Sequence, residues 1–303
     1  MADQIGERQL LWIDVDGRTE VDMGLIASAV GIGPSLAKEL GAVRARADLT
    51  QYPEHIHLVL QAMEAPREGD DAAPRLIRHS IDIVAGRNWV VTVHDGPVRS
   101  FDRLDAETHG ETRLGALDAA GFVATIADEV LAGYLELVEA IEREIDHLDE
   151  RALRRRPHND VLVSIVGLRQ RIGMIRRTLA PHRVAFAALA RPEMELHEEL
   201  GRPWPGLTER LELTLEAVQN LRELLLGTFD VHMGRATQEA NDVMKVLTLL
   251  SAVLLPSVVL AGVMGMNFDM PWFGDPNNFW FVVGTMSGFA AVIAVVARWR
   301  RWI

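Results

Sequence analysis

Two long apolar runs near the C-terminus constrain the fold of this chain more than any other feature. Residues 246–266 and 279–297 are mostly apolar, and a short loop separates them. An α-helix rises about 1.5 Å per residue, so about 20 residues cross the hydrocarbon core of a bilayer. The sequence therefore predicts a membrane protein with two transmembrane helices in its last fifth.

Charged residues at the ends of the two runs predict their orientation. Lys245 precedes the first run and Arg298 follows the second, whereas the loop carries Asp269 and Asp275 but no Lys or Arg. By the positive-inside rule, both termini are expected in the cytoplasm and the loop outside. We therefore expect a multi-pass protein of the cell inner (plasma) membrane, with most of the chain in the cytoplasm.

Composition narrows the range of partners. The net charge is −12 and the sequence pI is about 5.3, which argues against nucleic acid because phosphate backbones select faces rich in Lys and Arg. The chain has no cysteine, so a bound metal must be held by oxygen or imidazole ligands, and oxygen ligands favour hard cations such as magnesium. The expected partners are the lipid bilayer and divalent cations.

The predicted fold class is α+β, and residues 1–113 are expected to form a mixed α/β cytoplasmic domain. The apolar periodicity of residues 24–40 predicts a helix that is interrupted at 31–34. His55 and His57 lie on one face of a predicted strand, and we interpret them as ordinary sheet residues because no third metal ligand is evident. Apolar runs rich in β-branched residues predict strands at 10–15, 55–63, 76–84 and 89–94.

Residues 114–244 are expected to form a stalk of long helices, and residues 245–303 the transmembrane domain. Apolar residues recur every three or four positions from Leu131 to Leu148, as in an amphipathic helix. A second helix is predicted at 159–180, where Pro181 allows a kink or break before the helix continues towards Leu200, and a turn at 203–206 precedes the third. The third is a nearly continuous helix of about 60 residues, about 90 Å long, that runs from the cytoplasm through the membrane.

One face of this third helix changes character where it enters the membrane. At alternating three- and four-residue steps it is acidic from Glu209 to Asp230, and small or weakly polar from Thr237 to Gly265. A lipid-facing surface is expected to be uniformly apolar, so this face is typical of a pore lining. Taken alone, it fits equally well a solvated acidic face followed by a helix-packing face.

Three stretches resemble the CorA family of divalent-cation channels: residues 241–248, the pair Leu255-Pro256, and residues 261–268, which contain Gly265-Met266-Asn267. That family is defined by Gly-Met-Asn at the outer end of the first of two C-terminal spans. The resemblance extends inward to Asp230, and the architecture fits over the whole chain. It implies a funnel-shaped homopentamer whose first span lines the pore.

The resemblance also implies which residues form the outer mouth. Gly265, Met266 and Asn267 are the candidate selectivity filter, in which a ring of Asn267 amides suits the hydration shell that magnesium gives up reluctantly. Asp269 and Asp275 are candidates for attracting cations over about 8 Å. Their alternative interpretation is as ordinary loop carboxylates that cap a turn.

Further candidates lie along the pore and at its cytoplasmic side. Asp230 matches a family position at which magnesium bridges subunits, and Glu223 is a further candidate for cation attraction. Carboxylates brought together by two subunits repel each other unless a divalent cation neutralises them, so bound regulatory magnesium would keep the pore closed. Val258 stands where CorA proteins commonly have threonine. The candidate pore-lining residues are Asn241, Met244, Leu247, Thr248, Ser251, Leu255 and Val258, of which the apolar ones would gate by dewetting.

The predicted function is magnesium uptake gated by intracellular magnesium, with cobalt and nickel as further substrates. One alternative is proton-coupled zinc transport, because residues 176–183, 278–280 and 300–303 also resemble the ZntB branch of the same superfamily. A second alternative is a membrane-anchored helical scaffold or sensor that does not conduct. The chain is not expected to be an enzyme, since it has no nucleophile elbow, His-Glu-x-x-His or Walker loop.

Overall fold

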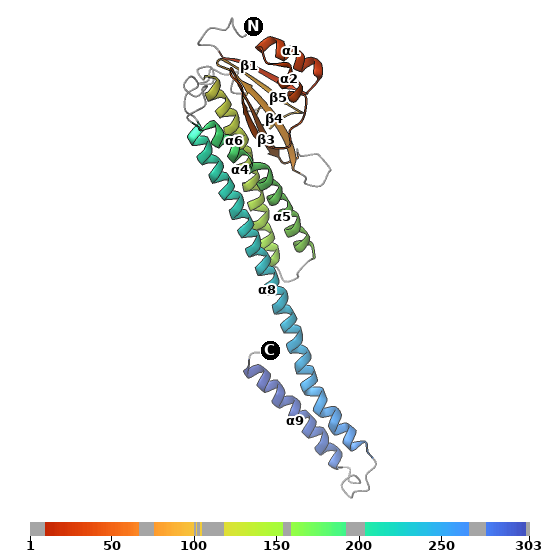
Figure 1. The fold of residues 1–303 in the computed structure, drawn as a ribbon. Helices are drawn as coiled ribbons and strands as arrows, with labels where there is room; N and C mark the ends of the chain where they lie inside the picture. The colour runs from red at the N-terminus through yellow and green to blue at the C-terminus, as the bar shows by residue number, and fades with distance from the viewer. Residues whose placement is uncertain are drawn as a thin grey trace. The chain divides into compact units, whose positions relative to one another are not determined.

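The chain divides into two compact units, Met1–Phe229 and Asp230–Ile303. The computed structural model describes residues 10–66, 76–99, 101, 104, 118–153, 159–191, 204–266 and 277–300. The first unit contains a sheet and a helical bundle, and the second contains the end of the longest helix and one further helix (Figure 1).

A sheet forms the N-terminal part of the first unit, as predicted, and it is a mixed sheet of five strands, of which four were predicted. Its strands lie in the order β1-β5-β4-β3-β2; β1 and β5 run parallel and the other neighbours antiparallel. The edge strand β2 was not predicted, because its four residues, Asp-Leu-Thr-Gln, show no run of apolar or β-branched side chains. The strands are β1 (Leu11–Asp16), β2 (Asp48–Gln51), β3 (Ile56–Glu64), β4 (Ile77–Ala85) and β5 (Trp89–His94).

Helices cover both faces of the sheet. On one face, α1 (Glu20–Val30) and α2 (Pro34–Leu40) pack on a cluster that includes Val84 and Val91. On the other face, α4 packs on a cluster that includes Ile83. Side chains alternate between the faces of a strand, so β4 contributes to both cores. The predicted interruption of the first helix is confirmed, since Gly31 ends α1 in the left-handed conformation, with φ +80°.

Four helices continue the first unit, and the last of them extends into the second. They are α4 (Ala119–Leu153), α5 (Asn159–Leu179), α6 (His182–Leu189) and α8 (Trp204–Met264). The break at Pro181 is confirmed, but the turn predicted at 203–206 is wrong at its C-terminal side because α8 already begins at Trp204. Proline and glycine are tolerated in a first helical turn, whose amides have no intrahelical acceptor, and Trp204 is buried at 3% exposure.

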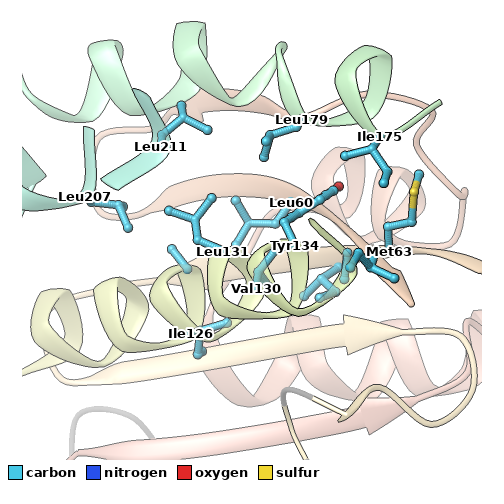
Figure 2. Close-up of a cluster of buried hydrophobic side chains, with 14 of the residues drawn as sticks. Leu60, Met63, Ile126, Val130, Leu131, Tyr134, Ile175, Leu179, Leu207 and Leu211 are labelled. Carbon is cyan, nitrogen blue, oxygen red and sulfur yellow. The ribbon is translucent and has the colours of Figure 1, made fainter. Parts of the chain in front are cut away.

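The first half of α8 carries a regular buried stripe. Figure 2 shows Leu207 and Leu211 of α8 in one cluster with Leu131 of α4 and Leu179 of α5. Steps of three and four residues place side chains on one face of a helix, so α8 packs against the bundle along its length in this unit. The buried positions are Trp204, Leu207, Leu211, Thr214, Val218, Leu221, Leu225, Thr228 and, beyond the first unit, His232.

Buried side chains join the sheet to the bundle at Gln61 of β3. Asp48, the first residue of strand β2, pairs with Val59, so β2 does not extend along β3 as far as Gln61. Instead, the Tyr134 hydroxyl donates to the backbone carbonyl of Gln61 at 2.7 Å, and the backbone amide of Gln61 donates to Nε2 of His182 at 3.0 Å. Nδ1 of His182 lies 3.0 Å from the carbonyl of Leu179. Two side chains from different helices therefore take the place of a strand partner.

The second unit contains the C-terminal part of α8 and α9 (Asn277–Trp299). Both helices are long and apolar enough to span a membrane, as predicted. In α8, partly buried residues recur at Lys245, Leu249, Val253, Leu260 and Met264, which marks the face toward α9. In α9 the matching face contains Val282, Met286, Ala290, Ile293 and Ala297.

Candidate ion-conduction path

The candidate pore-lining residues lie on the part of α8 that α9 leaves uncovered. Met244 is 61% exposed, Leu255 66% and Val258 67%, and Asn241, Leu247, Thr248 and Ser251 are exposed as well. Exposure alone does not separate this face from neighbouring apolar positions such as Leu250, which is 54% exposed. The candidate face differs by its small and hydroxyl-bearing residues, which suit close contact with an ion path or another helix.

Thr248 lies at the edge of this face. Its hydroxyl donates to the Met244 carbonyl at 2.8 Å, and its side chain also borders a groove between α8 and α9. A threonine hydroxyl keeps acceptor capacity after donating one hydrogen bond. The Thr248 oxygen therefore remains available to a hydrated cation.

The C-terminal end of α8 presents backbone carbonyls. The Gly265 amide donates to the Ala261 carbonyl at 2.9 Å, and the Met266 amide donates to the Val263 carbonyl at 3.2 Å. The last carbonyls of a helix have no intrahelical donor, and the helix dipole makes this end partly negative. The end of α8 at Gly265 and Met266 is thus electrostatically suited to a cation. Asn267, Asp269 and Asp275 lie outside the described residues.

The acidic candidates on the first half of α8 are exposed. Glu223 and Asp230 both face away from the buried stripe. Within the described ranges, no three His, Asp or Glu side chains are grouped closely enough to hold a metal ion. A magnesium site at Asp230 would therefore need ligands from outside these parts of the protomer.

One acid of the predicted stripe has a structural role. Nε of Arg183, from α6, donates to Oε1 of Glu212 at 2.6 Å, and the second guanidinium nitrogen pairs with Oε2. This hydrogen bond lowers the pKa of the Glu212 carboxyl below its usual value and raises that of Arg183. Glu212 thus links α8 to α6 within one protomer, which spacing along α8 did not indicate.

His55 and His57 have different surroundings in the structure. His57 is buried, and its Nε2 lies 2.7 Å from Oδ1 of Asp82, whose other oxygen pairs with Arg18 at 2.8 Å. His55 precedes β3 and stacks on Tyr52, with 4.8 Å between ring centroids. The Arg18–Asp82–His57 cluster was missed from sequence because its members lie on β3, β4 and the segment after β1.

Comparison with known proteins places these features in a family. The profile of the family described as "CorA-like Mg2+ transporter protein" matches residues 7–298. The cobalt/magnesium transport protein CorA of Thermotoga maritima is 23% identical over 297 residues, which cover 96% of this chain and 83% of that protein.

Two solved structures share the fold. The complete CorA magnesium transporter from Methanocaldococcus jannaschii superposes with a TM-score of 0.79 at 20% identity, covering 97% of this chain and 92% of that one. The ZntB cytoplasmic domain from Vibrio parahaemolyticus has a TM-score of 0.61 at 13% identity, covering 75% of this chain and 88% of that one.

Proposed function

The chain belongs to the CorA-like Mg²⁺ transporter family, and we propose that it is a divalent-cation channel for magnesium uptake, with cobalt and nickel as further substrates. One observation carries the proposal. The 61-residue helix α8 leads from the cytoplasmic bundle to Gly265-Met266-Asn267, and its membrane face with small and polar residues is left open by its own protomer.

A single copy of α8 cannot enclose a pore, so the active form is a closed ring of identical subunits. We propose a homopentamer in which α8 lines the pore, α9 lies outside it, and both termini are cytoplasmic. The exposed apolar residues of α8, such as Leu254 and Val259 at 50% and 56% exposure, support assembly because lipid or other subunits must cover them.

Ions enter this pore as hydrated species. A ring of Asn267 amides, together with the partly negative end of α8, orders the water around magnesium without stripping it. Deeper in the pore, Leu247 and Leu255 form constrictions that close by dewetting. Val258 adds a further apolar ring, and Asn241 a polar ring at the inner end.

Magnesium on the cytoplasmic side closes the channel in this proposal. Asp230 is exposed on α8, where a bound divalent cation would neutralise its repulsion from a carboxylate of the adjacent subunit. When internal magnesium falls, the carboxylates repel and the long helices separate. The ion must therefore bind the closed state more tightly than the open state.

Ion flux into liposomes tests the filter. We expect Asn267→Ala to abolish magnesium uptake, because the amide ring is removed, while Asn278→Ala at the start of α9 keeps it. The oligomer mass of both variants serves as the folding control. Uptake by Asn267→Ala at the wild-type rate would instead support the non-conducting scaffold.

The gating step has its own matched pair of variants. Asp230→Asn should raise the internal magnesium concentration needed for closure, whereas Glu239→Gln, an exposed acid off the candidate face of α8, should not. Current is measured at graded internal magnesium concentrations. Identical magnesium dependence in both variants and wild type would contradict the regulatory role of Asp230.

Zinc transport is the second candidate, supported by the shared fold of the ZntB cytoplasmic domain. Flux of magnesium, cobalt, nickel and zinc, with and without an imposed proton gradient, separates the two functions. Magnesium uptake driven by its own gradient supports the main proposal. Proton-dependent zinc uptake with little magnesium flux supports the alternative.

A further inference from the structure

A groove lies between α8 and α9 at the end of the spans that carries Lys245 and Arg300. Its volume is about 300 Å³, which is at the lower end for small-molecule pockets and far too small for another helix. Six of its eight lining residues are apolar. The lining consists of Thr248, Leu249 and Ala252 of α8, and Val292, Ile293, Val296, Ala297 and Arg300 of the C-terminal segment.

The two polar lining residues differ in what they offer a ligand. The Thr248 hydroxyl already donates to the Met244 carbonyl. Arg300 is exposed, and its guanidinium has no carboxylate partner within the described part of the chain. By contrast, Nζ of Lys245 pairs with Oδ1 of Asp242 at 2.8 Å. Arg300 therefore places a positive charge, unpaired with any carboxylate of the described residues, at the edge of an apolar groove.

We propose that this groove binds an anionic phospholipid, with an acyl chain along the apolar lining and the phosphate on Arg300. The basic end of the spans faces the cytoplasmic leaflet by the positive-inside rule, where anionic lipids attract basic residues. A second copy of this segment would bring another Arg300 and Arg298, and like charges would repel. Charge complementarity thus favours lipid over a second copy, and the site does not depend on whether the chain conducts.

Binding is measured by native mass spectrometry of the full-length protein, titrated with phosphatidylglycerol or phosphatidylcholine of identical acyl chains. We expect phosphatidylglycerol to bind about fivefold more tightly, the effect of roughly one basic residue near a lipid headgroup. Arg300→Gln should remove this preference, whereas Arg298→Gln, outside the groove lining, should keep most of it. Free glycerol phosphate should not compete, because it lacks the acyl chain.

A second variant tests the apolar part of the site. Ala252→Phe should weaken the binding of both lipids, because it fills the groove, and should leave the oligomer mass unchanged. Equal affinity for the two lipids, or equal loss of preference in Arg300→Gln and Arg298→Gln, would overturn the proposal. The proposal would also be overturned if Ala252→Phe changed the oligomer mass and left lipid binding as strong as in the wild type. That result would identify a second copy of the chain as the occupant of the groove.

Discussion

The two halves of α8 form one continuous helix, yet they differ in what covers them. In the first half, Leu211 and Leu221 are 0% and 1% exposed, and buried residues recur up to His232. From Asn241 to Met266 no residue is buried within the protomer. The first half thus completes its packing inside its own protomer, whereas the second needs lipid or other copies.

The difference follows from the pattern of side chains and not from helix formation. In the first half, apolar residues keep to one stripe with Glu, Arg and Gln between them, so one face becomes core and the rest meets water. In the second half, apolar residues surround the helix. The same backbone geometry therefore serves a packed bundle and a segment that is apolar enough to span a membrane. Stability experiments should separate the two.

The largest difference in the free energy of unfolding is expected between Leu211→Ala and Leu255→Ala, which make the same substitution in the two halves. Removing the buried Leu211 side chain should destabilise the first unit by about 2–5 kcal/mol, because it leaves a cavity. Leu255 is 66% exposed, so its loss should change that stability by about 0.5 kcal/mol or less. Urea unfolding followed by near-UV circular dichroism measures both, and equal destabilisation would remove the contrast.

Lowering the pH should reduce the free energy of unfolding of the first unit, because His182 is buried in its neutral form. Complete burial lowers the pKa of His182 to about 4, against about 6.5 in an unfolded chain. As pH falls below about 6.5, the unfolded chain binds a proton that the folded one does not, so about 3 kcal/mol of stability should be lost by about pH 4. We expect His182→Gln to flatten this part of the pH dependence; an unchanged slope would contradict the assignment.

Tyr134→Phe should lower the free energy of unfolding by about 1–3 kcal/mol, because the buried backbone carbonyl of Gln61 loses its donor. The chain has one other tyrosine, Tyr52, which is partly exposed and stacks on His55. Tyr52→Phe is therefore the matched control, and its unfolding free energy should stay close to that of the wild type. A similar loss in both variants would show that the hydroxyl bond to Gln61 is not the cause.

His94 should change the free energy of unfolding with pH in the opposite direction to His182, and by less. Burial alone lowers the pKa of His94, but its hydrogen bond to Asp14, the charge of Asp14, the Gly96 carbonyl and Asp16 together raise it. Its stabilising contribution is then fully present below about pH 6.5, the unfolded value, and is lost as pH rises through the folded pKa. NMR titration of the imidazole measures this, and a pKa below 6.5 would reverse the prediction.

Much of the secondary structure could be predicted from local pattern. Four of the five strands, the break at Pro181 and the long helix ending near Met264 follow from alternation, proline positions and apolar periodicity. Strand β2 could not be predicted, because only its pairing with β3 makes those four residues a strand. The roles of Asn267 and Asp230 rest on resemblance to the family and stay predictions.

Local sequence pattern specifies which faces are apolar, where two helices are long enough to cross a membrane, and where Gly265-Met266-Asn267 follows the first of them. These features depend on residues a few positions apart, whose spacing is set by helix and strand geometry. Three features appear only in the folded chain: Gln61 donates to His182, Glu212 pairs with Arg183, and Arg300 borders a groove beside Ala252. Those contacts join residues from separate elements, and local periodicity does not specify which elements pack together.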